Sequence, residues 1–263
     1  MDLGLKGRRA LVMGASKGLG RSIADALAAE GATLAISGRD QASLDKAAAE
    51  LRAAGAAAAT GLVADVAQGE QMDRLADAAI AAMGGVDILV LNHGGPPPCI
   101  ASEITDASLH TWFEQIVASP IRIANRLIPA MRKQGFGRVI VVGSTGMQHP
   151  IPNLALSNTL RAAIWGWLKT YAGEAAKDGV TMNVLAPGSI MTDRIVQNAA
   201  SRAAKAGTTP EDEMARMSDE IPAGRIGTTE EFGPMGAFLA SDRAAYITGS
   251  MIRVDGGRVR SML

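Results

Sequence analysis

Residues 13–20 read Met13-Gly14-Ala15-Ser16-Lys17-Gly18-Leu19-Gly20, and they stand between an apolar run, Arg8–Val12, and a segment whose apolar residues have helical spacing. The stretch predicts a strand, a glycine turn and a helix. Backbone N–H groups at the N-terminus of such a helix can bind a phosphate. Gly14 permits the tight turn, Gly18 lets the backbone come close to the phosphate, and Gly20 lets the helix pack closely on the strand. The alternative is a plain turn in a chain rich in alanine and glycine, so the remaining sequence has to decide.

Composition narrows the class of protein. The chain has 263 residues, of which 48% are hydrophobic and 20% charged, as in ordinary globular proteins. Lys plus Arg and Asp plus Glu both number 26, so no basic excess favours nucleic acid or an anionic membrane as a partner. One cysteine excludes an internal disulfide and a cysteine metal cluster, and we predict no metal site. No signal-peptide or membrane-spanning pattern is present, so we expect a soluble cytoplasmic protein.

Strand and helix patterns alternate along the whole chain. After the first strand, further strands are predicted at Thr33–Ser37, Gly61–Asp65, Val86–Leu91, Arg138–Val142, Val180–Leu185 and Met251–Val254. Helices are predicted from Asp40 to about Ala54, at Glu70–Met83, over most of Asp106–Lys133 with a kink at Pro120, and within Pro152–Lys177. The alternation predicts an α/β fold, a single Rossmann-like domain over 1–263 with a doubly wound parallel seven-stranded sheet and helices on both faces.

In such sheets the ligand binds outside the carboxyl ends of the strands. Polar residues, glycine or proline follow six of the predicted strands: the glycine turn, Arg39, Asp65, Asn92, Ser144 and the pair Pro187-Gly188. About twenty residues after a glycine turn, dinucleotide folds usually carry an acid for the adenosine ribose. Here the second strand ends Ser37-Gly38-Arg39, and Lys17 lies in the turn, so two cations suit a 2′-phosphate and favour NADP(H) over NAD(H). The alternative makes both cations surface charges and Asp40 the ribose ligand.

Several motifs together resemble the short-chain dehydrogenase/reductase family, in the branch of the 3-oxoacyl-carrier-protein reductases. They are Gly14-x-x-x-Gly18-x-Gly20, Asp65, Asn92-His93-Gly94, Ser144, Val184-Leu185-Ala186-Pro187-Gly188-Ser189-Ile190-x-Thr192 and Val254-Asp255-Gly256-Gly257, and they span essentially the whole chain. The resemblance implies a cofactor site that includes the glycine turn with Ser16 and Leu19, and the pair Pro187-Gly188. It also implies that Asp65 and Val66 frame the adenine, that Asn92 and Gly94 line the cofactor, and that Ile190 and Thr192 hold the nicotinamide amide.

The catalytic residues depart from the family pattern. The family uses a Tyr-x-x-x-Lys pair, in which tyrosine is the acid/base and lysine binds the nicotinamide ribose and lowers the tyrosine pKa. When the family pattern is aligned on Ser144 and on the helix that follows it, the tyrosine and lysine positions fall on Ser157 and Arg161. The family's helical asparagine falls on Ile116, with Gln115 one position away. Ser144 alone is clearly kept, so the resemblance implies an atypical catalytic set of Ser144, Ser157 and Arg161, with Arg161 also at the cofactor.

The replacement changes what the site can do with protons. A tyrosine pKa of about 10 can be brought toward neutrality by a cation, whereas serine is a far weaker and shorter acid. Arg161 can bind ribose hydroxyls or an anion, but it cannot shuttle protons as lysine can. His149 and His93 are candidate acids, although a loop histidine is more often a surface or packing residue. We interpret Tyr171 and Cys99 as packing residues.

The segment after the sixth strand is an insert, Asp193–Pro222, which matches the family's substrate lid at about 190–225. Its acidic residues are interpreted as a solvated face: Glu211, Asp212, Glu213, Asp219 and Glu220. The helix after Ser157 is apolar on several sides, including Trp165, which together with the family resemblance predicts a homo-oligomer, a dimer or a tetramer.

The leading hypothesis is an NADP(H)-dependent oxidoreductase acting on a small carbonyl or alcohol, in which Ser144 polarises the substrate oxygen. One alternative is a non-redox enzyme of the elimination or retro-aldol type, with Arg161 holding an anionic substrate. The other is a catalytically silent dinucleotide-binding protein. A complete set of cofactor motifs beside an altered catalytic set is compatible with all three hypotheses.

Overall fold

The computed structural model describes residues 1–262, and Leu263, the last residue of the predicted domain, lies outside that range. Seven parallel strands form one sheet in the order β3-β2-β1-β4-β5-β6-β7. Their bounds are β1 Arg9–Val12, β2 Thr33–Gly38, β3 Ala58–Val63, β4 Ile88–Leu91, β5 Gly137–Val142, β6 Val180–Pro187 and β7 Met251–Val254. The predicted doubly wound parallel sheet is confirmed.

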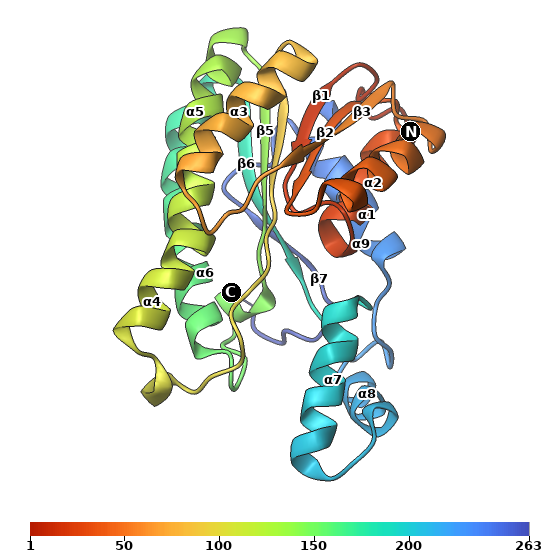
Figure 1. The fold of residues 1–263 in the computed structure, drawn as a ribbon, viewed down its shortest axis with the longest axis vertical. Coiled ribbons are helices and arrows are strands. Elements are labelled where there is room, and N and C mark those ends of the chain that lie inside the picture. The colour runs from red at the N-terminus through yellow and green to blue at the C-terminus, as the bar shows by residue number, and fades with distance from the viewer. Residues whose placement is uncertain (263) are drawn as a thin grey trace.

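Helices cover both faces of the sheet (Figure 1). On one face, α1 (Gly18–Ala29), α2 (Gln41–Ala53) and α9 (Thr229–Ala240) enclose a core with Ala10 and Val12 of β1. On the other face, α3 (Glu70–Met83), α5 (Ser119–Gln134) and α6 (Ala155–Ala175) pack on Leu11 of the same strand. Because neighbouring side chains of β1 enter opposite cores, its three buried positions, Ala10, Leu11 and Val12, all have to be apolar, as they are.

The third strand was predicted at Gly61–Asp65 and is found at Ala58–Val63. It pairs with β2 from Thr33↔Ala58 to Gly38↔Val63, so the full length of β2 determines where β3 begins and ends. A Cβ on Gly61 would lie 2.7 Å from Leu44 Cβ of α2, which shows how closely that helix approaches. Alanine carries little strand preference, so pairing and packing place this edge strand rather than local sequence.

The helical run before β5 is continuous but irregular. It consists of α4 (Asp106–Phe113), a π-helical turn (Glu114–Ala118) and α5. The irregularity thus lies just before Pro120, where a kink was predicted, and Pro120 sits in the first turn of α5. Proline has no N–H to donate to the preceding turn, so a turn with longer-range hydrogen bonds is accommodated there. Short 3₁₀ turns occupy Ala101–Glu103, Thr145–Met147, Ala176–Asp178 and Asp242–Ala244.

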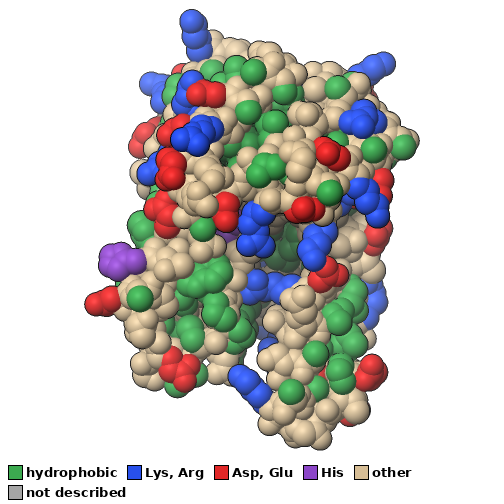
Figure 2. All heavy atoms as spheres, in the orientation of Figure 1, with side chains coloured by type: hydrophobic (Ala, Val, Ile, Leu, Met, Phe, Trp, Pro, Cys, Tyr) green, Lys and Arg blue, Asp and Glu red, His purple; other side chains and the backbone are tan. Residues whose placement is uncertain are grey.

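Two helices project beyond the carboxyl ends of the strands, α7 (Asp193–Ala206) and α8 (Pro210–Asp219) (Figure 1). They belong to the segment that the sequence predicted as a lid, and they leave a hollow between themselves and the sheet edge (Figure 2). Within residues 1–262, no helix is both long and apolar enough to cross a membrane.

Candidate active site

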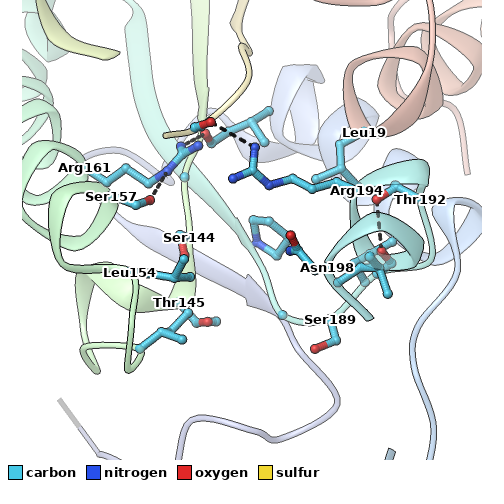
Figure 3. A pocket seen from close by; sticks show the side chains of 18 of the residues that line it. Leu19, Ser144, Thr145, Leu154, Ser157, Arg161, Ser189, Thr192, Arg194 and Asn198 are labelled. Atoms are coloured by element: carbon cyan, nitrogen blue, oxygen red, sulfur yellow. Dashed lines mark hydrogen bonds between the residues drawn. The ribbon is translucent and has the colours of Figure 1, made fainter. Parts of the chain in front are cut away.

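A cavity of about 220 Å³ lies between the carboxyl edge of the sheet and α7. Ser144, Ser157 and Arg161 lie on the wall formed by the β5 loop and α6, and residues of α7 face them across the cavity (Figure 3). The structure also brings part of the predicted cofactor set to this cavity: Leu19, Asn92, Gly94, Pro187, Gly188, Ile190 and Thr192. Residues distant in sequence meet here because all parallel strands end at the same edge, and the start of α6 places Ser157 and Arg161 beside that edge.

Ser144 begins the 3₁₀ turn that follows β5. Its Oγ accepts a hydrogen bond of 3.0 Å from the backbone N–H of Gly146, which fixes the side chain at the cavity wall. This bond uses a lone pair and not the hydroxyl proton. Ser144 can therefore donate its own proton in a hydrogen bond to an oxygen of a bound molecule.

Ser157 and Arg161 stand one turn apart on α6. Arg161 Nε donates to Ser157 Oγ at 3.3 Å, and Arg161 Nη1 donates to the carbonyl of Val142 at 2.9 Å. Arg161 is only 9% exposed, and within residues 1–262 it forms no ion pair. Burial, with the nearby charge of Arg194, lowers the pKa of Arg161 to about 10. The guanidinium stays protonated at neutral pH, so the site holds a buried cation.

His93 is not poised to act as an acid at neutral pH. Burial, followed by the charge of Arg161, lowers its pKa to about 3. Its Nδ1 lies 2.5 Å from the carbonyl of Gly94 and therefore carries the proton of the neutral ring. His149, the other candidate acid, is exposed and does not line the cavity.

The other residues that the sequence analysis considered for the site also lie outside the cavity. Ile116 is completely buried in an apolar cluster, and Gln115 Nε2 bonds the carbonyl of Thr111 on its own helix. Tyr171 packs edge-on against Trp167, with ring centroids 5.9 Å apart, which agrees with its interpretation as a packing residue. Cys99 is half-buried in a neighbouring groove beside the lid.

The glycine turn has the geometry of a phosphate cradle. Gly14 and Gly18 have φ of +58° and +67°, in the left-handed region that favours glycine. A Cβ on Gly14 would lie 2.8 Å from Asn92 Nδ2, and that amide clamps the turn by donating to the carbonyls of Met13 and Gly14 at 3.1 and 3.0 Å. Lys17 occupies the N-cap of α1, and no side-chain hydrogen bond caps the helix there. The first N–H groups of α1 fit a phosphate.

The remaining predicted cofactor residues lie along the sheet edge outside the cavity: Gly14, Ser16, Lys17, Gly18, Gly20, Arg39, Asp65 and Val66. Arg39 is exposed at the end of β2. Asp40 is used as a helix cap, because its Oδ1 accepts from the N–H and the hydroxyl of Ser43 at 2.8 and 2.5 Å. These two bonds hold the pKa of Asp40 below its usual value. Lys17 Nζ forms an exposed ion pair of 2.6 Å with Asp193 of α7.

Asp65 and Val66 are held by local hydrogen bonds. Asp65 Oδ1 accepts from the N–H of Ala67 at 2.9 Å, and the carbonyl of Val66 accepts from Ser119 Oγ at 2.7 Å. The loop after β3 is thereby tied to the start of α5. Only β2 separates β3, which leads into this loop, from β1, which leads into the glycine turn.

Sequence reasoning missed the cationic side of the cavity. Arg194, Asn198 and Arg202 recur every four residues on α7, and Arg258 follows β7. Arg194 donates from Nη1 to the carbonyl of Gly95 at 3.1 Å and from Nη2 to that of Pro96 at 3.0 Å. The spacing on α7 was a readable signal, whereas nothing in the sequence places Arg258 at this cavity.

The acidic residues of the lid were interpreted as one solvated face, and this is wrong for Glu213. Its side chain is buried and accepts hydrogen bonds from Thr208 Oγ1 at 2.9 Å and Arg216 Nη1 at 3.0 Å. Glu220 forms an ion pair of 2.7 Å with Arg258. Packing of α8 on α7 turns Glu213 inward, and its hydrogen bonds offset the cost of burying a carboxylate.

Comparisons with known proteins agree with this fold. The family described as Enoyl-(Acyl carrier protein) reductase matches residues 14–258. The chain is 34% identical to Dehydrogenase/reductase SDR family member 4 of Sus scrofa, over 96% of this chain and 88% of that one. It is also 34% identical to the 3-oxoacyl-[acyl-carrier-protein] reductase FabG of Escherichia coli (strain K12), over 97% and 98% of the two chains.

A solved structure is similar over the entire chain. It is the L-sorbose reductase from Gluconobacter frateurii, complexed with NADPH and L-sorbose, with a TM-score of 0.94 and 31% sequence identity, covering 100% of both chains. The similarity extends over the glycine turn, the seven-stranded sheet and the lid. This chain therefore belongs to the short-chain dehydrogenase/reductase family of oxidoreductases.

Proposed function

We propose that this protein is an NADP(H)-dependent oxidoreductase that acts on a small carbonyl or alcohol through Ser144, Ser157 and Arg161. The observation that carries the proposal is the meeting of these three side chains in one cavity with Ile190 and Thr192. The likeness to a reductase complexed with NADPH supports the choice of cofactor.

The residues at the end of β2 favour a cofactor with a 2′-phosphate, NADP(H), over one with a free ribose hydroxyl, NAD(H). An NAD-binding acid would have to stand at the end of β2, and Asp40, the first acid there, is engaged in capping α2. Arg39 is exposed beside Asp40, and its side chain forms no hydrogen bond or ion pair with the residues that the structure describes. Lys17 joins it once the exposed contact to Asp193 opens, which costs little.

The chain's own groups set up the reaction around a hydride, which the nicotinamide supplies when bound. Ser144 donates its free hydroxyl proton in a hydrogen bond to the substrate oxygen, and Ser157 does the same while its Oγ accepts from Arg161. The buried charge of Arg161 stabilises negative charge that develops on that oxygen. With the nicotinamide bound, the carbonyl carbon would gain its hydride and the carbonyl oxygen would take a proton from water, because His93 is neutral and arginine does not release protons readily.

The lid completes the site in this proposal. The segment 190–225 carries α7 and α8, and two neighbouring residues of α7 connect it to the rest of the site. Asp193 pairs with Lys17 of the glycine turn, and Arg194 reaches the carbonyls of Gly95 and Pro96. The Arg194 contacts hold the lid over a bound substrate and exclude bulk water from the reacting atoms, while Lys17 turns from Asp193 to the cofactor.

The test is direct. The protein is incubated with NADPH and a panel of small ketones and aldehydes while the nicotinamide absorbance is followed, and with the matching alcohols and NADP⁺ in the reverse direction. We expect turnover that falls about 100- to 1000-fold in Ser144→Ala, the usual value of an oxyanion donor. Parallel samples without cofactor are analysed for elimination or carbon–carbon cleavage products. Such products without nicotinamide turnover would establish the non-redox alternative instead.

A further inference from the structure

The wall of the cavity is strongly cationic. Four arginines line it, Arg161, Arg194, Arg202 and Arg258, and no aspartate or glutamate does so among the residues that the structure describes. Figure 2 shows Lys and Arg side chains gathered around the hollow between the sheet edge and the lid. An ordinary uncharged ketone or alcohol needs no such charge, so the excess calls for an explanation.

Three polar side chains of the lid point the same way. Arg194, Asn198 and Arg202 are four residues apart on α7, which places them on one face of the helix, and all three line the cavity. Figure 3 shows Arg194 extending from α7 across the cavity toward Arg161. The groups that Arg194 contacts, the carbonyls of Gly95 and Pro96, are neutral and leave its charge uncompensated.

Arg161 on α6 and Arg194 on α7 bring two positive charges close to Gly95 from opposite sides of the cavity. A Cβ built on Gly95 would lie 3.2 Å from Arg194 Nη2 and 3.5 Å from Arg161 Nη2. Arg161 is nine-tenths buried and has no carboxylate partner within residues 1–262. Arg161 is buried and Arg194 reaches it from the exposed side, so the two guanidinium groups repel each other, and an anion between or beside them removes the repulsion.

Arg258 extends the cationic wall at the other end. Its Nη1 donates to Ser189 Oγ at 2.6 Å, and its Nη2 pairs with Glu220 at 2.7 Å, so the guanidinium is held in place with its charge partly compensated. Arg202 lines both this cavity and the adjoining groove. Within the described chain Arg202 forms no ion pair, so it has a full charge to offer a ligand.

The phosphates of a dinucleotide do not account for this wall. They have their own donors in the uncapped N–H groups at the start of α1, on the Leu19 side of the cavity. We propose that the substrate itself carries a small oxyanion group, a carboxylate or a phosphate, which Arg194 and Arg202 bind with help from Arg258. The inference rests on the proposed function and narrows its substrate class to anionic carbonyl compounds or alcohols.

The first experiment measures binding without the cofactor. Ligand-observed NMR in a phosphate-free buffer compares levulinate with its methyl ester, and dihydroxyacetone phosphate with dihydroxyacetone. We expect the charged member of at least one pair to bind about tenfold more tightly than its neutral match, the value of one charge-assisted contact. The pair that responds tells a carboxylate site from a phosphate site.

Variants connect the binding to the lid. Arg194→Gln and Arg202→Gln are expected to weaken binding of the charged probe about tenfold each, and the neutral probe by less. Arg74→Gln removes an exposed arginine of α3 outside both cavities and serves as the matched control. Arg194 and Arg202 are both exposed, so these variants should fold, which melting temperatures check.

Two results would overturn the inference: equal binding within both probe pairs, or unchanged binding of the charged probe in both lid variants. Turnover is measured with the same compounds and NADPH. Selective binding without nicotinamide turnover would keep the anion site and refute the redox function. Equal turnover of charged and neutral carbonyls, together with equal binding, would keep the redox function and refute the anion site.

Discussion

The cofactor preference depends on one exposed residue, Arg39, at the end of β2. Its guanidinium is available for a 2′-phosphate, since Asp40 beside it caps α2 and Lys17 pairs with Asp193. Arg39→Ala removes this contact without disturbing the cap or the sheet. The variant should lose affinity for NADPH and keep its affinity for NADH, which has no 2′-phosphate.

The expected magnitude follows from exposure. A charge-assisted contact to phosphate lies among the stronger hydrogen bonds, but Arg39 is exposed and water screens the charge. We therefore expect a loss of about tenfold in NADPH affinity, the low end for such contacts. Lys17→Ala should cost less, because Lys17 has to leave Asp193 before it can bind the phosphate. Asp193→Asn should strengthen NADPH binding by at most about fivefold, the value of a surface ion pair.

The assay is a fluorescence titration of both reduced nucleotides against the parent protein and the three variants. Arg74→Ala, which removes an exposed arginine of α3, measures the effect of net charge alone. Equal affinities of the parent protein for NADPH and NADH would refute the reasoning. So would an Arg39→Ala variant that binds NADPH as well as the parent does.

Three further predictions test other parts of the molecule. Ser157→Ala should lower kcat/KM by less than about tenfold, far less than Ser144→Ala, because serine is a poor proton donor; steady-state kinetics of the two variants would expose an equal role. Desolvation lowers the pKa of His93 from its ordinary value of 6.5 to about 3, so the unfolded chain takes up this proton at a higher pH than the folded chain does. The free energy of unfolding therefore falls as pH falls from about 6.5 toward 3. The melting temperature should consequently drop less in His93→Asn than in the parent between pH 7 and pH 4, and identical drops would contradict the burial of the ring. Light scattering at micromolar concentration should give a dimer or a tetramer, joined through the face of α6 that carries Trp165, and a monomeric mass would exclude the assembly.

Local patterns in the sequence were sufficient for the architecture. Strands buried on both faces carry continuous apolar runs, as Ala10, Leu11 and Val12 do, and such runs predict a parallel sheet before the pairing of the strands is known. Gly14, Gly18 and Gly20 show where the backbone turns sharply and where a helix begins. Such features depend on residues that are neighbours along the chain. The edge strand β3 was misplaced because its alanines carry little local preference, and pairing with β2 decides its bounds.

The sequence also determined which side chains would gather at the sheet edge, because parallel strands end together; Ser144, Ser157 and Arg161 do share one cavity. Only the tertiary structure decided the charge of that cavity. Arg194 and Arg202 face it because α7 packs across the strand ends, and Arg258 arrives from the end of the chain with Glu220 holding it. The desolvation that keeps His93 neutral and the packing that buries Glu213 are likewise produced by segments distant in sequence. Burial and electrostatic fields depend on distances through space, which residue order does not contain.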